Sequence, residues 1–344
     1  MPKNCSVVKT VFVRDRLLLR GKRKMPSAPL TDAHGTDIIR LNENGRGGGV
    51  MNERNAGIER IKYIGAVLLY GTIGTFLRFV NLPSELVALG RGVIGSLFIL
   101  LWLAVRRKKP DGGAIRRNGT WLLLSGICLG LNWIFLFAAY VKTTVAVASL
   151  CNYMAPVIVI LLAPVLLREK LNRKKLPCIL AALVGIVLVS GVWGSGGADP
   201  VGVSLGLCAA LCFAGIVVCN RKIEGISSLD KAVVQLAVSA LTILPYAIFR
   251  NLSAELNPDG RSVLIVLLLG AVHTGFAYCL YFSGMGSLPV QTVAILGYLE
   301  PVVSVLCSAF FLKESLSVSG WIGAVLILTA AAVSELIPEP GEEK

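Results

Sequence analysis

"PVIVILLAPVLLREKL" occupies positions 156–171, and "PVVSVLCSAFFLKESL" occupies positions 301–316. Each stretch runs from a proline through mostly apolar residues to a basic residue, a glutamate and a leucine. The two align without a gap, so that Glu169 matches Glu314 at an offset of 145 residues. Repetition at a fixed offset predicts a chain built from two similar halves.

The composition indicates an integral membrane protein. Of the 344 residues, 55% are hydrophobic and only 16% are charged, and the mean hydropathy is +0.72. A soluble protein carries about 25% charged residues. The charges gather near the amino terminus and in short loops, and the runs between them reach the roughly 20 residues that cross a bilayer as a helix.

Ten such runs are present, five in each half, and the short loops between them leave no room for a soluble catalytic domain. We therefore expect an all-α integral membrane protein of ten transmembrane helices. The expected spans are Ile61–Val80, Leu86–Val105, Trp121–Val141, Thr144–Leu167, Leu176–Ser195, Val201–Asn220, Ala232–Phe249, Ser262–Gly284, Pro289–Leu312 and Val318–Ile337.

The basic residues predict the orientation of the chain. The net charge is +14, and lysine and arginine concentrate in alternate loops, "RRKKPDGGAIRR" at 106–117 and "REKLNRKK" at 168–175. Cytoplasmic loops carry this excess in membrane proteins. We read the basicity as an orientation signal, not as a nucleic-acid site, and expect a multi-pass protein of the cell (cytoplasmic) membrane with both termini in the cytoplasm.

An odd number of spans per half places matching residues on opposite membrane faces. Glu169 should then be cytoplasmic and Glu314 external. Two such halves form inverted-topology five-helix repeats, which give transporters two nearly equal conformations, one open to each side.

Motifs for other chemistries are missing from the sequence. The nine cysteines show no two-residue metal or redox spacing, the two histidines lie far apart, and no phosphate-binding glycine loop is present. We expect no metal, no cofactor and no enzymatic activity. The alternatives are a flippase for lipid-linked substrates or a membrane-embedded enzyme. An enzyme would normally gather several acids or histidines at one membrane face, whereas Glu300 is essentially the single intramembrane acid.

The sequence resembles a known family. "ALGRGVIGSLFILL" (88–101), "GAVHTGFAYCLYFSG" (270–284) and "LGYLEPVVSVLCSAFFLKESL" (296–316) are similar to segments of EamA-type transporters of the drug/metabolite transporter superfamily. The resemblance covers about 61–337. It implies a ten-helix secondary carrier, commonly an exporter, that moves small organic solutes through a cavity between the halves.

Charged residues inside the spans are the first candidates for the site. Glu300 lies near the middle of the ninth span, where an acid costs about 2.5–3.5 kcal/mol and so should face protein or water. It could couple transport to protons, bind a cation, or pack helices as a hydrogen-bonded group. Arg91, in the second span, could contact an anionic substrate, pair with an acid, or extend to the lipid headgroups.

Polar and aromatic residues of equivalent spans complete the predicted cavity. Trp133 matches Tyr278, and the position of Tyr153 matches Tyr298. Such residues also serve as helix-packing groups and interface anchors. The expected substrate contacts are Asn132, Trp133, Asn152, Tyr278, Tyr298 and Arg91. Pro156 and Pro301 are expected to interrupt the fourth and ninth spans near the cavity.

The sequence also suggests the extent of the repeats. We expect a basic tail at 1–58, repeats at 59–197 and 198–337, and a short tail at 338–344. The first fifty residues lack the apolar content to fold alone, and Met51 begins a segment that leads directly into a span. The expected partners are a small-molecule substrate and the lipid bilayer, and a homodimer is compatible with the sequence.

Overall fold

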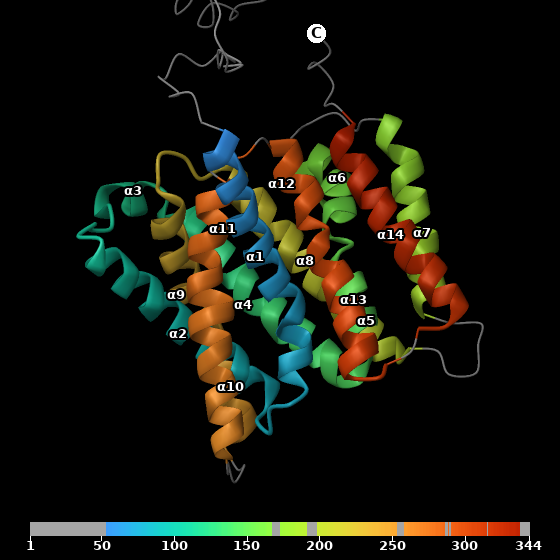
Figure 1. The fold of residues 1–344 in the computed structure, drawn as a ribbon, viewed down its shortest axis with the longest axis horizontal. Coiled ribbons are helices and arrows are strands. Elements are labelled where there is room, and N and C mark those ends of the chain that lie inside the picture. Colours follow the sequence, from blue (N-terminus) through green and yellow to red (C-terminus); the bar gives the residue numbers. More distant parts are fainter. Residues whose placement is uncertain are drawn as a thin grey trace, which may run out of the picture. The chain divides into compact units, whose positions relative to one another are not determined.

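The computed structural model describes residues 53–166, 173–190, 198–252, 258–285, 288, 290–314 and 316–337, which belong to one compact unit. The expectations for the first fifty residues and for Glu169 fall outside these ranges. Within them the regular structure is helical throughout, without a strand (Figure 1). The predicted all-α class is confirmed for this part of the chain.

Helices follow one another in the same order in the two halves. Those of the first half are α1 (Glu53–Leu77), α2 (Ser84–Val105), α3 (Gly112–Arg117), α4 (Gly119–Lys142), α5 (Val145–Asn152), α6 (Ala155–Leu166), the 3₁₀ turn η1 (Arg173–Lys175) and α7 (Leu176–Ser190). Those of the second half are α8 (Pro200–Arg221), α9 (Ser228–Asn251), α10 (Gly260–Gly270), the π-helical η2 (Ala271–Phe276), α11 (Ala277–Met285), α12 (Val290–Gly297), α13 (Leu299–Phe311) and α14 (Val318–Leu336).

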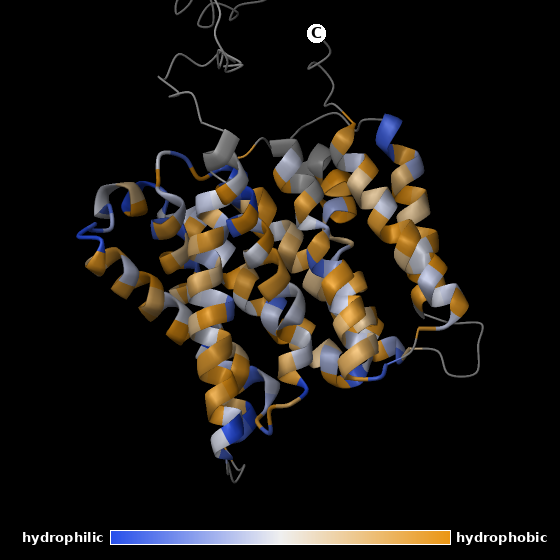
Figure 2. Ribbon diagram, viewed as in Figure 1, coloured by the Kyte–Doolittle hydropathy of each residue, from blue (hydrophilic) through white to orange (hydrophobic). Residues whose placement is uncertain are grey.

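The helices have the length and composition of membrane spans. Six helical stretches of the described chain are long and apolar enough to cross a bilayer, and further apolar helices are shorter. Large side chains such as Leu101, Leu241 and Phe310 are well exposed on the outside of the bundle. Hydrophobic residues cover the middle of the bundle, while hydrophilic ones gather at its two ends (Figure 2). This is a multi-pass membrane protein, with lipid as the natural solvent of its outer surface.

Several contacts between helices occur twice, once for a helix of the first half and once for its counterpart in the second half. In the first half α4 packs against α8 and α9, and in the second half α11 and η2 pack against their counterparts α1 and α2. Two further large contacts pair a helix with its own counterpart, α2 with α9 and α7 with α14. Helix α1 also packs against α13, as its counterpart α8 packs against α6, and α5 contacts α13. The two halves therefore interlock around a shared centre.

Polar contacts define the two ends of the bundle. At the Glu59 end, where α1 begins, the Ser283 hydroxyl of α11 donates to Glu59 at 3.0 Å. At the Glu314 end, Arg78 after α1 binds both Glu314 and the Thr143 carbonyl that follows α4. Helix α8 begins beside Thr143, because a Cβ at Gly202 would lie 2.7 Å from the Thr143 Cβ. Helices α1 and α8, which hold equivalent positions, thus start at opposite ends.

Glycines allow the closest helix contacts. A Cβ on Gly71 of α1 would lie 2.6 Å from the backbone oxygen of Glu300, and one on Gly323 of α14 would lie 2.5 Å from the backbone oxygen of Gly185 on α7. Small residues let membrane helices pack backbone to backbone. The first contact brings α1 directly against the start of α13, where the candidate site lies.

Candidate functional site

Two equivalent spans are broken near their middle. The expected fourth span is interrupted at Tyr153 and Met154, between α5 and α6, and the expected ninth span at Tyr298, between α12 and α13. Pro156 and Pro301 lie in the first turn of the helix that follows each break, where a missing N–H removes no helix hydrogen bond. The breaks thus precede the prolines by two to three residues, and four helix ends meet inside the bundle.

Arg91 lies in the interior and not among lipid headgroups. Its side chain, on α2, is 4% exposed. The guanidinium lies 4.4 Å from the centre of the Trp133 ring and 5.3 Å from that of Phe137, and its Nε donates to the Thr274 hydroxyl at 3.1 Å. Stacking on tryptophan is the strongest form of the cation–π contact. Of the readings open for Arg91, the headgroup anchor does not fit this position.

The tyrosines of α1 and α11 form an aromatic wall beside Arg91. Ring centres lie 5.9 Å apart between Tyr70 and Tyr278, 5.8 Å between Tyr70 and Tyr281, and 5.6 Å between Tyr278 and Phe282. These rings are half-buried although they lie between helices. The wall faces the region where the helix breaks meet.

Glu300 lies in the first turn of α13 and is also half-buried. The Tyr153 hydroxyl is within hydrogen-bonding reach of its carboxyl group, and Arg91 and several tyrosines are within electrostatic range. Arg91 and Glu300, both in the described part of the chain, form no direct ion pair. The amino-terminal turn of a helix favours a negative charge, so the break that starts α13 also provides a suitable place for this carboxylate.

The two asparagines form a pair beside this cluster. Asn132 Nδ2 donates to Asn152 Oδ1 at 3.0 Å and to the Ala209 backbone oxygen at 2.8 Å. Both of its donor hydrogens are therefore used, and its side chain is buried. Asn132 ties α4 to α5 and α8, and it positions Asn152, which is half-buried next to the helix break.

The structure brings most of the sequence-predicted residues to one region. Arg91, Trp133, Tyr278 and Glu300 belong to one cluster, and Tyr298 marks the break before α13. Sequence reasoning missed Tyr70 and Tyr140. Tyr140 follows Trp133 by seven residues, which is two turns along the same helix face. That spacing could have identified Tyr140 from the sequence.

A chain of hydroxyl groups joins the cluster to the seam between α5 and α13. Tyr140 and Ser149 are hydrogen-bonded at 3.2 Å, and Ser149 is bonded to Ser304 at 2.7 Å. Both serines are buried. The seam connects the two halves with short polar contacts.

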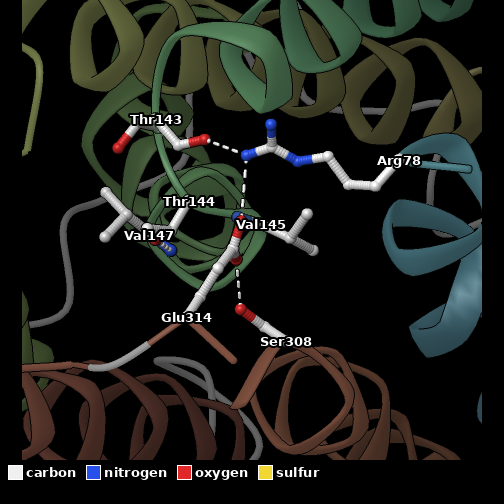
Figure 3. Close-up of polar contacts among 7 residues, drawn as sticks. All are labelled: Arg78, Thr143, Thr144, Val145, Val147, Ser308 and Glu314. Atoms are coloured by element: carbon white, nitrogen blue, oxygen red, sulfur yellow. Dashed lines mark hydrogen bonds and ion pairs between the residues drawn. The ribbon is translucent and has the colours of Figure 1, made fainter. Parts of the chain in front are cut away.

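A second polar site lies at the Glu314 end (Figure 3). The Glu314 carboxylate accepts the backbone N–H of Val145 at 2.8 Å, binds Arg78 at 2.9 Å and accepts the Ser308 hydroxyl. Thr144 also caps α5, since its hydroxyl accepts from the Val147 N–H at 3.1 Å. A residue after α13 in the second half therefore closes the start of α5 in the first half.

Comparison with known proteins gives consistent matches across both halves. The model of the EamA-like transporter family matches residues 61–191 and 200–335. An uncharacterized transporter of Bacillus subtilis (strain 168), YxxF, is 28% identical over 278 residues, which cover 80% of this chain and 88% of that protein. Protein PecM of Dickeya dadantii (strain 3937) is 27% identical over 219 residues, covering 61% of this chain and 71% of PecM.

A solved crystal structure shares the fold. It covers 82% of this chain and 99% of its own, with a TM-score of 0.59 and 23% sequence identity. The family match spans both repeats of helices, including α2, η2, the two broken spans and the Glu314 loop that build the sites described above. The chain belongs to the EamA-like transporter family.

Proposed function

We propose that this protein is a secondary transporter that moves small organic metabolites across the cell membrane by alternating access. The observation that carries the proposal is the cluster of Arg91, Trp133, Tyr278 and Glu300 at the helix breaks. It draws side chains from both halves into the interior of a membrane bundle. Charged groups at that depth are costly and mark substrate or ion pathways, and broken helices provide such sites in transporters.

The arrangement of the halves supports ten spans in two inverted-topology repeats, at 59–197 and 198–337. Joining α5 to α6, α10 to α11 through η2, and α12 to α13 turns the helices into five crossings per half. The opposite directions of α1 and α8 fit an inverted relation. With the basic loops in the cytoplasm, both termini are cytoplasmic, the Glu59 end faces the cytoplasm and the Glu314 end faces outward.

Unequal packing at the two ends supports an inward-open conformation. Helices α5 and α13 are in contact toward the Glu314 end, whereas no comparable contact joins α6 and α12 among the residues that the structure describes. The half-buried polar side chains around Tyr153 and Glu300 then line a passage that opens toward the Glu59 end. Rocking of one repeat against the other would exchange the two ends.

Within the site, Arg91, Trp133, Asn152, Tyr278 and Tyr298 contact the substrate, with Asn132 holding Asn152 in place. Glu300 couples transport to protons or to exchange, because a carboxyl group that faces a passage can gain and lose a proton during the cycle. We propose export as the physiological direction.

Reconstitution in liposomes tests the proposal. Proteoliposomes loaded with mixed metabolites should lose particular solutes faster than liposomes that contain the Glu300→Gln variant, with a rate that responds to an imposed pH gradient or to counter-solute. Movement of fluorescent lipid between leaflets, without solute flux, would favour a flippase and overturn the proposal. Chemical conversion of a solute without its movement would favour an enzyme.

A further inference from the structure

The guanidinium group of Arg91 has donors that the protein does not use. Its side chain donates one hydrogen bond, from Nε to the Thr274 hydroxyl at 3.1 Å, and the described residues supply no acceptor for the two terminal nitrogens. Within that part of the chain, Thr75 Oγ1 is the only fully enclosed side-chain nitrogen or oxygen without a hydrogen-bond partner. The terminal nitrogens of Arg91 therefore keep a small accessible surface, although the residue is only 4% exposed.

The surroundings hold the guanidinium in a fixed orientation. The rings of Trp133 and Phe137 lie at 4.4 Å and 5.3 Å from its central carbon, and Thr274 fixes Nε from the side. The side chain is 4% exposed, so little freedom remains to be lost when a ligand binds. A planar guanidinium with free terminal nitrogens matches a carboxylate, which it binds through two parallel hydrogen bonds.

The charges nearby favour a single carboxylate over a phosphate. Arg91 is the one cationic group that acts on Glu300 in the described chain. A phosphate carries up to two negative charges and three strong acceptor oxygens, and one arginine beside a glutamate cannot balance it. A carboxylate brings one charge, which Arg91 neutralises directly. The half-buried rings of Tyr70 and Tyr278 then provide an apolar surface for the rest of the molecule.

We propose that the site selects solutes that carry a carboxylate, held by the terminal nitrogens of Arg91. This inference rests on the proposed transport function and names the substrate class of the same site. Glu300 determines how the remaining charge is balanced: an ammonium group on the solute can pair with it, or a proton can neutralise it.

Matched compounds test the carboxylate directly. Purified full-length protein is screened by thermal shift against acids, each paired with its primary amide, over small aliphatic and aromatic bodies and with or without an amino group. A ligand that binds the folded state raises the apparent Tm. We expect hits among the acids and none among their amides. Amides that stabilise as well as their acids, or a series without any acid hit, would overturn the inference.

Two variants test whether Arg91 binds the carboxylate, and both use binding rather than transport activity as the readout. Arg91→Lys keeps the charge but not the two parallel donors, and we expect at least about tenfold weaker acid binding. Because Arg91 stacks on Trp133, acid binding should change tryptophan fluorescence in the wild type and not in Trp133→Phe. Unchanged acid affinity in a folded Arg91→Lys protein would contradict the inference, and circular dichroism with an unaltered elution volume establishes folding.

The comparison of acids with and without an amino group shows how the charge of Glu300 is neutralised, by a solute ammonium group or by a proton. If zwitterions bind and simple acids do not, Glu300 pairs with the ammonium group, and Glu300→Gln should abolish that preference. If simple acids bind, they should do so better at low pH, because Glu300 must then carry a proton.

Failure of the inference is distinguishable from failure of the proposed function. Transport of amides or amines but not of acids in proteoliposomes would support the proposed transport function and contradict the proposed selectivity for carboxylates. Binding of acids at Arg91 without any solute flux would support the proposed carboxylate site and contradict the proposed transport function.

Discussion

Arg78 and Glu314 form an ion pair of 2.9 Å that joins the residue after α1, in the first half, to the loop after α13, in the second (Figure 3). The same carboxylate accepts the Val145 N–H at the start of α5. One side chain thus holds together three segments around the contact of α5 with α13. Under alternating access, these bonds must break before the Glu314 end can open.

Glu314→Gln should weaken the closure of this end. Glutamine can still accept the Val145 N–H, but it loses the charge that binds Arg78 and favours the start of α5. The ion pair is partly exposed, with 34% and 15% of the two side chains accessible, so the expected loss of stability is only about 1 kcal/mol. We expect a lower apparent Tm and faster labelling of a cysteine placed at Ser304, inside the seam.

Lys313→Gln provides the matched control. Lys313 is the exposed neighbour of Glu314, and the control changes the local charge by one unit without touching the carboxylate. It should leave both Tm and labelling near wild type. Equal labelling rates at Ser304 in the wild type and in Glu314→Gln would mean that Glu314 does not hold this end closed.

Glu300→Gln should lower solute flux by at least about tenfold, which corresponds to about 1.4 kcal/mol, and should flatten the dependence of flux on pH. The amide keeps the size of the side chain but cannot exchange a proton. Initial rates in proteoliposomes, measured across a series of pH values at matched protein levels, check the prediction.

Glu85→Gln is a suitable comparison because Glu85 is another buried acid of the bundle, held near the Glu314 end by Asn251 at 3.2 Å. We expect it to keep the pH dependence. If Glu300→Gln retains both rate and pH dependence, Glu300 is a packing residue and the coupling proposal loses its intramembrane acid.

Lys109 and Lys142 should lie on opposite sides of the membrane. Lys109 follows α2 at the Glu59 end, and Lys142 ends α4 at the Glu314 end, and both are exposed. In a protein without native cysteines, Lys142→Cys should react with a membrane-impermeant maleimide in intact cells, and Lys109→Cys only after permeabilisation. The reverse pattern would invert the proposed orientation, and equal reactivity would refute an odd number of crossings between the two sites.

Gly323→Val should destabilise the contact of α14 with α7. The added Cβ would meet the Gly185 backbone oxygen at 2.5 Å, and a backbone atom cannot move aside without shifting a helix. We expect a loss of about 1–3 kcal/mol and a lower apparent Tm. Gly119→Ala, where a Cβ meets nothing within 4 Å, should have little effect. A wild-type Tm for Gly323→Val would show that α7 and α14 pack differently.

Much of the fold follows from the sequence because membrane helices leave a strong local signal. Apolar runs of about twenty residues and a fixed offset of 145 residues are enough to expect two similar helical halves. Trp133 and Tyr278 could be predicted to lie in one region because equivalent positions in two interlocked repeats face the same centre, and both lie near Arg91. Glu300 and Arg91 stood out because charge is rare inside a span.

The remaining features depend on contacts between distant segments. Glu314 closes the start of α5 at Val145, 169 residues away, and no local pattern in the sequence connects the two. The sequence predicts that Asn132 contacts substrate, and this stays a prediction; the structure adds that both its donors bond to Asn152 and Ala209. The side-chain partner of a buried asparagine depends on the rotation of its helix, and the sequence does not encode that rotation locally. The helix breaks lie before Pro156 and Pro301 and not at them, because proline fits the first turn of a helix.

The π-helical turn η2 connects the winding of one helix to the orientation of Arg91. In a wide turn, a side chain can bond to the carbonyl five residues earlier, and the Thr274 hydroxyl donates to the Leu269 carbonyl at 2.9 Å while it accepts Arg91 Nε at 3.1 Å. His273, one residue earlier, contacts the Leu268 carbonyl in the same way at 3.4 Å. A ligand that draws Arg91 away from Thr274 therefore removes one support of the wide turn. Binding of a ligand to the Arg91 guanidinium would then change the helical pitch between η2 and α11, the helix that carries Tyr278.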